Sequence, residues 1–232
     1  MNVLFICSDT FRWDYLGCYG NEWIHTPNLD ALAAESVVFE DAFAEGLPTL
    51  PARRVMHTGR RIIPMRTIPQ PSDMVHLPGW HPLFAEDVTL AEVLRDAGYV
   101  GCYVTDVYHA MKPGKNFHRG FEHWFWIRGV EDDPYNLRDE RQVEEMLTQA
   151  THWGNRPPKK RHWIVQHLVG RKDWKTDADT LVGRVMARAA DWLKHYTLDE
   201  PFVLFVDCFD PHEPWDPPEH YARRYSPTYE NF

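Results

Sequence analysis

Two continuous apolar runs, one near each end of the 232-residue chain, constrain its fold more than any other feature. Residues 2–8 read Asn-Val-Leu-Phe-Ile-Cys-Ser and are followed by Asp9, and residues 201–208 read Pro-Phe-Val-Leu-Phe-Val-Asp-Cys. Apolar runs of this length are typical of buried strands in a parallel sheet. Because ligands of open α/β sheets bind at the carboxyl ends of the strands, Asp9 is a candidate ligand-binding residue.

Helical patterns alternate with strand-like runs between these two segments. Further strands are expected at residues 37–43 and 99–105. Helices are expected from an N-cap at Thr26, over residues 49–60, from a capping box at Thr89 to a stop at Gly98, and over residues 177–196. This alternation predicts an α/β fold, with a doubly wound, largely parallel sheet and helices on both faces.

Four segments lack a clear strand or amphipathic-helix pattern. Residues 61–86 are rich in Pro, His and Met and are interpreted as an excursion loop over the site. An irregular aromatic region is expected from residue 108 to about residue 136, and a polar helix is expected over 137–150. The basic, aromatic stretch 152–174 is interpreted as a solvated loop or a subunit contact.

Composition excludes several classes of partner. A formal net charge of −9 argues against nucleic acid or an anionic membrane as the main partner, and no apolar run is long enough to cross a bilayer. The four cysteines show no CxxC spacing, so Cys7 and Cys208 are expected to be buried free thiols. No signal peptide is visible, so a cytoplasmic location is predicted, and a homo-oligomer is left open.

The junction at Thr49 brings a hydroxyl to the start of an expected helix, after a loop that contains Gly46 and Pro48. Backbone N–H groups point outward at a helix start, and the helix dipole favours an anion there. Arg53 follows one turn later and has two donors for an oxyanion. Taken alone, the stretch is better explained by an N-cap at Thr49 and a surface charge at Arg53.

Five motifs in a fixed order change that interpretation. They are Thr49-x-Pro-x-Arg53 with Thr58-Gly-Arg60, the segments 2–14 and 26–33, Gly120-Phe-Glu122, and Asp210-Pro-His-Glu-Pro-Trp215. Together they resemble the sulfatase family of the alkaline phosphatase superfamily. The resemblance implies an alkaline-phosphatase-like fold and a metal-dependent hydrolase of esters. It also implies that residues 1–232 are the N-terminal portion of a catalytic domain.

The resemblance assigns roles to individual residues. Asp9 and Thr49 would bind one or two divalent cations, which could be Mn, Zn, Ca or Mg. Thr49 would attack the ester, Arg53 and His109 would hold its non-bridging oxygens, and His212 would assist the leaving group. Many sulfatases carry two adjacent aspartates where this chain has Asp9-Thr10. Asp14 is expected to pair with Arg12 instead of binding metal.

Two departures from the family pattern bear on the substrate. Sulfatases convert a Cys or Ser at the position of Thr49 to formylglycine, whereas a Thr alkoxide would form an ester that water must hydrolyse. The lysine of the family's Lys-x-His motif is replaced by Val107, although His109 is retained. The sequence therefore favours a phosphate or phosphonate ester, with phosphodiesterase activity as one form. A sulfuric ester hydrolase resembling arylsulfatases and a non-catalytic anion-binding member are the alternatives.

One family feature is missing. The family completes its metal site with an Asp-Asn or Asp-His pair after the Pro-His-x-Pro segment, and this sequence contains neither dipeptide. We therefore expect a truncated chain that lacks the remaining metal ligands and the C-terminal subdomain. Such a chain is expected to be inactive unless another chain supplies those groups.

Overall fold

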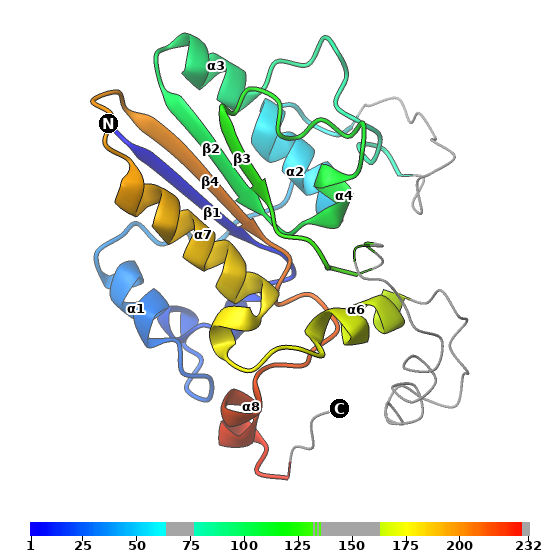
Figure 1. The fold of residues 1–232 in the computed structure, drawn as a ribbon. Helices are drawn as coiled ribbons and strands as arrows, with labels where there is room; N and C mark the ends of the chain where they lie inside the picture. Colours follow the sequence, from blue (N-terminus) through cyan, green and yellow to red (C-terminus); the bar gives the residue numbers. More distant parts are fainter. Residues whose placement is uncertain (64–76, 132, 134, 136–162, 229–232) are drawn as a thin grey trace.

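The protein was analysed as a computed structural model, which describes residues 1–63, 77–131, 133, 135 and 163–228 (Figure 1). Four strands form one sheet in the order β1-β4-β2-β3, and every neighbouring pair is parallel. They are β1 (Val3–Ser8), β2 (Val100–Thr105), β3 (His123–Trp126) and β4 (Phe202–Cys208). All carboxyl ends therefore lie at one edge of the sheet, as the sequence predicts.

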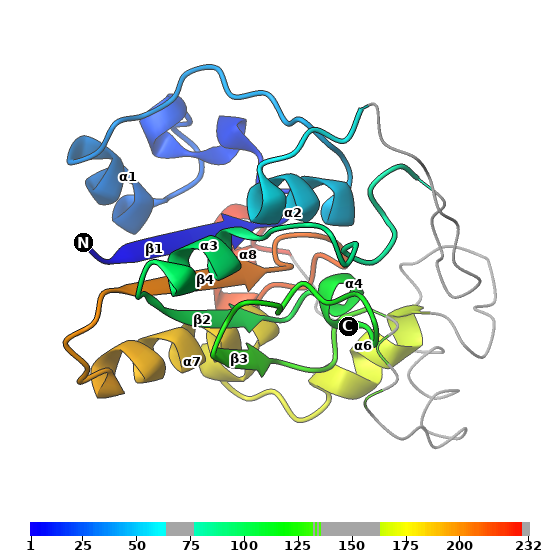
Figure 2. The ribbon, with the colours of Figure 1, turned by 90° about the horizontal axis from the view of Figure 1, so that it is seen from above.

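Helices cover both faces of this sheet (Figures 1 and 2). On one face lie α2, α3 and α4, and on the other lies α7. The described helices are α1 (Pro27–Ala34), α2 (Thr49–Thr58), α3 (Leu90–Asp96), α4 (Tyr108–Met111), α6 (Trp163–Arg171), α7 (Leu181–His195) and α8 (Glu219–Tyr225). Within the described part of the chain, no helix has the length and apolar character needed to cross a bilayer.

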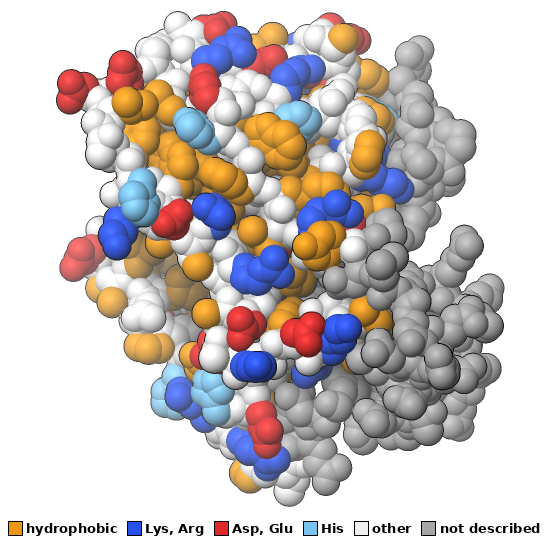
Figure 3. All heavy atoms as spheres, in the orientation of Figure 1, with side chains coloured by type: hydrophobic (Ala, Val, Ile, Leu, Met, Phe, Trp, Pro, Cys, Tyr) orange, Lys and Arg blue, Asp and Glu red, His pale blue; other side chains and the backbone are white. Residues whose placement is uncertain are grey.

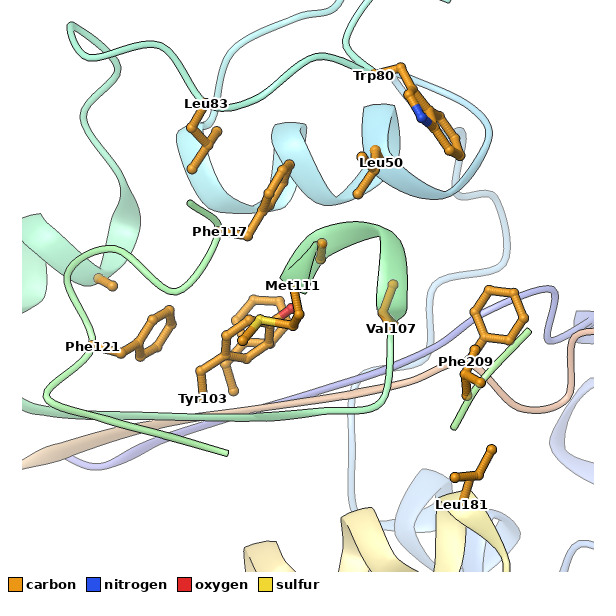
Figure 4. Packing of buried hydrophobic residues seen from close by; sticks show 14 residues of the cluster. Leu50, Trp80, Leu83, Tyr103, Val107, Met111, Phe117, Phe121, Leu181 and Phe209 are labelled. Atoms are coloured by element: carbon orange, nitrogen blue, oxygen red, sulfur yellow. The ribbon is translucent and has the colours of Figure 1, made fainter. Parts of the chain in front are cut away.

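The larger core lies between the sheet and the helices α2 to α4 (Figure 4). Leu50 of α2, Met111 of α4 and Phe117 pack here over the strand residues Tyr103 and Phe205. Each of these side chains removes apolar surface from water, which is the main driving force for seating α2 on the sheet. The helix that begins at Thr49 is thus held rigidly above the sheet.

The second core lies under α7. Val185 and Ala189 of this helix pack on Val104, Leu204 and other strand residues that point to the same face. The spacing of Val185 and Ala189 by four residues places both on one side of the helix, as the amphipathic pattern predicts. With helices on both faces, the doubly wound α/β class predicted from the sequence is confirmed.

Most of the predicted elements occur close to their expected bounds. The strands expected at 2–8, 99–105 and 201–208 correspond to β1, β2 and β4, and the helix expected at 177–196 corresponds to α7. The capping box at Thr89 is present, with the hydroxyl accepting from the Glu92 N–H and the Glu92 carboxylate accepting from the Thr89 N–H. Gly59 follows α2 with a φ of 65°, a left-handed conformation that favours glycine.

The expectation that β1 is buried on both faces is wrong for the described part of the chain. Leu4 and Ile6 are 53% and 54% exposed, because β1 is an edge strand that α7 does not reach. Their partners across the ladder, Leu204 and Val206, are buried under α7. Cys7 points to the opposite face of β1, beside the larger core, and is only half-buried, whereas Cys208 is buried as expected.

The prediction of a strand at residues 37–43 is also wrong. The structure has no strand there, and Val37 and Phe43 are 83% and 90% exposed. An apolar run stays out of a sheet when no neighbouring strand satisfies its backbone groups. Figure 3 shows a face of the molecule where hydrophobic side chains also remain at the surface between charged ones.

The remaining differences between the predicted and observed elements concern residues after 107. β3 and the short helix α4 lie in the region expected to be irregular. Residues 163–171 form α6, so the interpretation of 152–174 as a loop is wrong for this part. Leu168 and Val169 bury their side chains there and stabilise a helix. The polar helix expected at 137–150 lies outside the described residues, as does much of the loop expected at 61–86.

Candidate functional site

Thr49 lies at the start of α2, at the carboxyl-end edge of the sheet. It is the first helical residue and is 6% exposed, while Pro48 occupies the N-cap position. The alternative explanation of Thr49 as an ordinary N-cap is therefore wrong. Its hydroxyl belongs to a buried helix start, where backbone N–H groups favour a negatively charged ligand.

Arg53 lies one turn further along α2 and is buried, so the alternative explanation as a surface charge is also wrong. Its Nε and Nη2 donate to the two oxygens of Asp207, at 3.2 and 2.8 Å, and its Nη1 donates to Asp9 Oδ2 at 2.8 Å. Burial by itself would lower the pKa of Arg53, but the two carboxylates outweigh it and hold this pKa above its usual value. Arg53 thus links the carboxyl ends of β1 and β4 to α2.

Asp207 is a central residue of this cluster, and the sequence analysis did not single it out. It is fully buried at the end of β4, and it also accepts a hydrogen bond from the Tyr103 hydroxyl at 3.1 Å. The sequence feature that points to Asp207 is a single carboxylate inside the otherwise apolar run 201–208. A buried carboxylate needs a cation, and Arg53 is that cation.

Asp106 is a second buried carboxylate that the sequence analysis did not assign. It follows β2, and its Oδ1 accepts a hydrogen bond from the Phe209 N–H at 2.7 Å. Among the described residues its Oδ2 has no hydrogen-bond partner. Burial, together with the nearby Asp210 carboxylate, holds the pKa of Asp106 well above its usual range.

His109 lies on α4 and is 8% exposed. Its Nε2 is 2.5 Å from Oε2 of Glu131, a residue in the segment after β3. The ring also packs against Trp80 and Phe209, with centroid separations of 5.1 and 6.5 Å. Val107, at the position that the resemblance assigns to a lysine, is fully buried in the larger core and contributes no charge.

His212 follows β4 and lines a cavity of about 820 Å³. Its Nδ1 is 3.0 Å from the backbone oxygen of Glu213, and its ring stacks on Phe209 with centroids 4.2 Å apart. The cavity wall also includes Glu131, Asp210, Trp174, Trp215 and Tyr221. The wall is therefore mainly apolar and aromatic, with carboxylates among the polar groups.

The structure brings the predicted site residues together in two groups. Asp9 and Arg53 are in direct contact, and Thr49 lies on the same helix as Arg53. His109 and His212 both contact the ring of Phe209, with centroid separations of 6.5 and 4.2 Å. Asp14 pairs with Arg12 on the surface, as expected.

The described residues fit a divalent cation only in part. Asp9 Oδ2 is engaged by Arg53, and its Oδ1 accepts from the Thr10 hydroxyl at 3.3 Å. Both oxygens of Asp207 are engaged by Arg53. In the part of the chain that the structure describes, no group of three or more His, Cys, Asp or Glu side chains is placed to hold a metal. Asp9 and Thr49 would need additional ligands.

A parallel α/β sheet with a helix start and a buried arginine at its carboxyl edge is an arrangement that can bind an anionic ligand. The sulfatase family model matches residues 1–232, and the chain belongs to the sulfatase family. The family resemblance stated from the motifs is confirmed.

Relatives and solved structures agree with this assignment. The chain is 27% identical over 235 residues to an uncharacterized sulfatase, YidJ, of Escherichia coli (strain K12), covering 98% of this chain and 42% of that protein. It is 27% identical over 231 residues to human N-acetylgalactosamine-6-sulfatase, covering 92% and 40%. The crystal structure of a phosphonate monoester hydrolase of Agrobacterium radiobacter has the same fold, with a TM-score of 0.62, 23% identity, and coverage of 100% and 45%. The chain thus spans less than half the length of these proteins.

Proposed function

We propose that this chain forms part of a metal-dependent hydrolase that acts on a phosphate or phosphonate ester, with Thr49 as the nucleophile. The observation that carries the proposal is the geometry of α2. Its first residue is Thr49, and its next turn carries Arg53, whose guanidinium is fixed by Asp9 and Asp207. A nucleophile and an oxyanion-binding cation are thereby held on one rigid element.

The reaction would proceed in two displacements. In the first, the Thr49 hydroxyl gives its proton to solvent water, its oxygen forms a bond to phosphorus while the bond from phosphorus to the leaving oxygen breaks, and His212 gives the leaving oxygen a proton. In the second, water attacks the phosphorus and gives a proton back to His212, while the bond from phosphorus to the Thr49 oxygen breaks and Thr49 takes up a proton from solvent. A divalent cation held by Asp9 and Thr49 would lower the pKa of the attacking hydroxyl and stabilise charge on the ester oxygens.

The preference for phosphorus over sulfur rests on Thr49 and Val107. Threonine lacks the aldehyde hydrate that lets a formylglycine release sulfate, and Val107 supplies no cation where the family motif has a lysine. The phosphonate monoester hydrolase shows that the fold is compatible with such substrates. The sulfatase relatives support the alternative, a sulfuric ester hydrolase.

The cavity beside His212 would hold the alcohol part of a small anionic ester. Its aromatic wall, which includes Trp174 and Trp215, suits an apolar or stacking group. The charged end of the ester would lie outside this cavity, toward Arg53 and His109. The domain assignment, with residues 1–232 as the N-terminal portion of a catalytic domain, is part of the same proposal. The cytoplasmic location and a homo-oligomeric state stay predictions.

The test compares four matched aryl substrates with the full-length protein in the presence of Mn²⁺ or Zn²⁺. They are a phosphate monoester, a phosphodiester, a phosphonate monoester and a sulfate. We expect a phosphorus ester to be preferred and Thr49→Ala to reduce turnover at least about 100-fold. Thr58→Ala is the matched control, because Thr58 lies at the other end of the same helix, where its hydroxyl donates to the Arg54 backbone oxygen and accepts from the Arg60 N–H.

Each other outcome selects an alternative. A preference for the sulfate would establish a sulfuric ester hydrolase. Full activity of Thr49→Ala would rule out Thr49 as the nucleophile. The absence of turnover on all four substrates, combined with calorimetric binding of the anion without metal, would establish a non-catalytic binding protein.

A further inference from the structure

A close contact between two largely buried side chains, His109 and Glu131, lies beside the cavity that contains His212, and the scheme above gives Glu131 no role. The side chains of His109 and Glu131 are 10% and 16% exposed, and Nε2 lies 2.5 Å from Oε2. Glu131 Oε2 is buried, and among the described residues it has no partner with hydrogen-bond geometry. The His109 contact is therefore the interaction that offsets the cost of burying this carboxylate.

Hydrogen bonds among its neighbours hold the loop that carries Glu131. The Arg128 guanidinium binds Asp133 through two nitrogens, and the Gly129 N–H donates to the same carboxylate at 2.9 Å. The Asp133 N–H in turn donates to the Val130 oxygen at 3.0 Å. Glu131 itself has a φ of +48°, a left-handed conformation that costs free energy for a residue other than glycine. A closed loop holds this residue in a conformation that it would not adopt freely.

We propose that Glu131 is the positioning residue of His109. Its carboxylate lies against Nε2 and orients the ring, so that Nδ1 is the nitrogen left for the ester. This inference rests on the proposed function, because it assumes that His109 contacts the ester. The arrangement follows the general logic in which a carboxylate on one ring nitrogen fixes the other nitrogen for the substrate.

The surroundings of His109 support this role. The rings of Trp80, Tyr108 and Phe209 pack around the imidazole and restrict its orientation. Glu131 also lines the cavity that contains His212, so the pair lies at the boundary between the protein interior and the space proposed for the ester. A Glu131 carboxylate that stays against His109 keeps its charge away from the anionic end of the ester, whereas one turned into the cavity would repel it.

The first test does not depend on activity. Long-range ¹H–¹⁵N spectra of ¹⁵N-histidine-labelled protein report the protonation of each ring nitrogen, and His109→Gln assigns the His109 signals. We expect Nε2 of His109 to carry a proton, because it faces the Glu131 carboxylate, and Glu131→Gln to change the distribution of protons between the two ring nitrogens. An unprotonated Nε2 in the unaltered protein, or spectra that Glu131→Gln does not change, would overturn the proposal. Glu131→Asp serves the same test if Glu131→Gln fails to fold.

The second test measures turnover on the substrate that the protein prefers. Glu131→Gln should lower kcat/KM by about 10- to 100-fold, and Glu86→Gln, an exposed control, should leave it unchanged. In a His109→Gln background the Glu131 substitution should have no further effect, because Glu131 acts through His109. An additive loss in the double variant, or a gain of activity in Glu131→Gln, would overturn the proposal. If no substrate is turned over, the spectra alone decide it.

Discussion

At the scale of single residues, the buried charges decide how the site is built. Arg53 and Asp207 are 3% and 0% exposed and share two hydrogen bonds. In a buried pair each charge depends on the other, because removing one leaves the partner without compensation in a medium of low polarity. The cluster therefore contributes to the stability of the fold as well as to the proposed reaction.

Asp207→Ala should lower the free energy of unfolding by about 3–5 kcal/mol, because Arg53 would keep only Asp9 as a partner. Urea denaturation with a circular dichroism readout measures the change. The matched control is Asp14→Ala, which breaks the exposed pair between Asp14 and Arg12 and should leave the unfolding midpoint nearly unchanged. Equal effects of the two substitutions would contradict this account of Asp207.

His57 gives the protein a pH-dependent stability. The ring is buried among Tyr103, Phe117 and Phe205, and burial, aided by the charge of Arg53, lowers the pKa of His57 to about 3 from 6.5. In the unfolded chain the ring regains an ordinary pKa and binds a proton below about pH 6.5. The unfolded state therefore binds more protons, and the protein loses stability as pH falls from about 6.5 toward 3.

His57→Leu should flatten that pH dependence. Unfolding midpoints measured at pH 7 and pH 4.5 should differ less in the variant than in the unaltered protein, because leucine does not titrate. His195→Gln, which changes an exposed histidine, should leave the difference between the two pH values almost unaltered. A variant that loses as much stability on acidification as the unaltered protein would show that His57 is not responsible.

At the scale of elements, Arg54 joins α2 to the segment 79–87. Its side chain is fully buried and donates to the backbone oxygens of Gly79, His81 and Pro82 and to the Asp87 carboxylate. Burial, opposed by the charge of Asp87, lowers the pKa of Arg54 to about 10, so the side chain stays charged at neutral pH. The planar guanidinium reaches all of these acceptors at once, which a lysine ammonium cannot do.

Arg54→Lys should lower the free energy of unfolding by about 2–4 kcal/mol, because several buried oxygens would lose their donor. Thermal unfolding measures the change. Arg60→Lys is the control, since Arg60 is 56% exposed and lies 3.4 Å from the same Asp87 carboxylate. We expect little effect of the control. A comparable loss in both variants would mean that the loss does not come from the buried hydrogen bonds that the Arg54 guanidinium donates.

At the scale of the whole molecule, the carboxyl edge of the sheet collects residues from widely separated parts of the chain. Asp9 follows β1, Asp106 follows β2, Asp207 is the last residue but one of β4, and Arg53 reaches this edge from α2. Asp9 and Asp207 pair with Arg53, and Asp106 accepts a hydrogen bond from the Phe209 N–H, so we expect that the fold does not depend on a bound metal. Under the proposed function, turnover does depend on a bound metal.

Treating the full-length protein with EDTA should therefore abolish turnover while the circular dichroism spectrum stays unchanged. Dialysis against Mn²⁺ or Zn²⁺ should restore the activity, because the proposed attack by Thr49 needs a cation to lower the pKa of its hydroxyl. Residual turnover in EDTA at the original rate would contradict a metal-dependent mechanism. A collapse of the spectrum would instead show that the metal is structural.

The sequence by itself determined the parallel α/β class, the family, and the bounds of the main elements. These depend on local patterns: apolar runs for β1 and β4, a capping box before α3, and the spacing of Thr49 and Arg53 on one helix. Only the tertiary structure decided the partners of the buried charges, since Asp207, Glu131 and Arg54 meet their partners across many residues of sequence. It also decided that residues 37–43 stay outside the sheet and that β1 lies at its edge, because strand pairing depends on neighbours that no local pattern specifies.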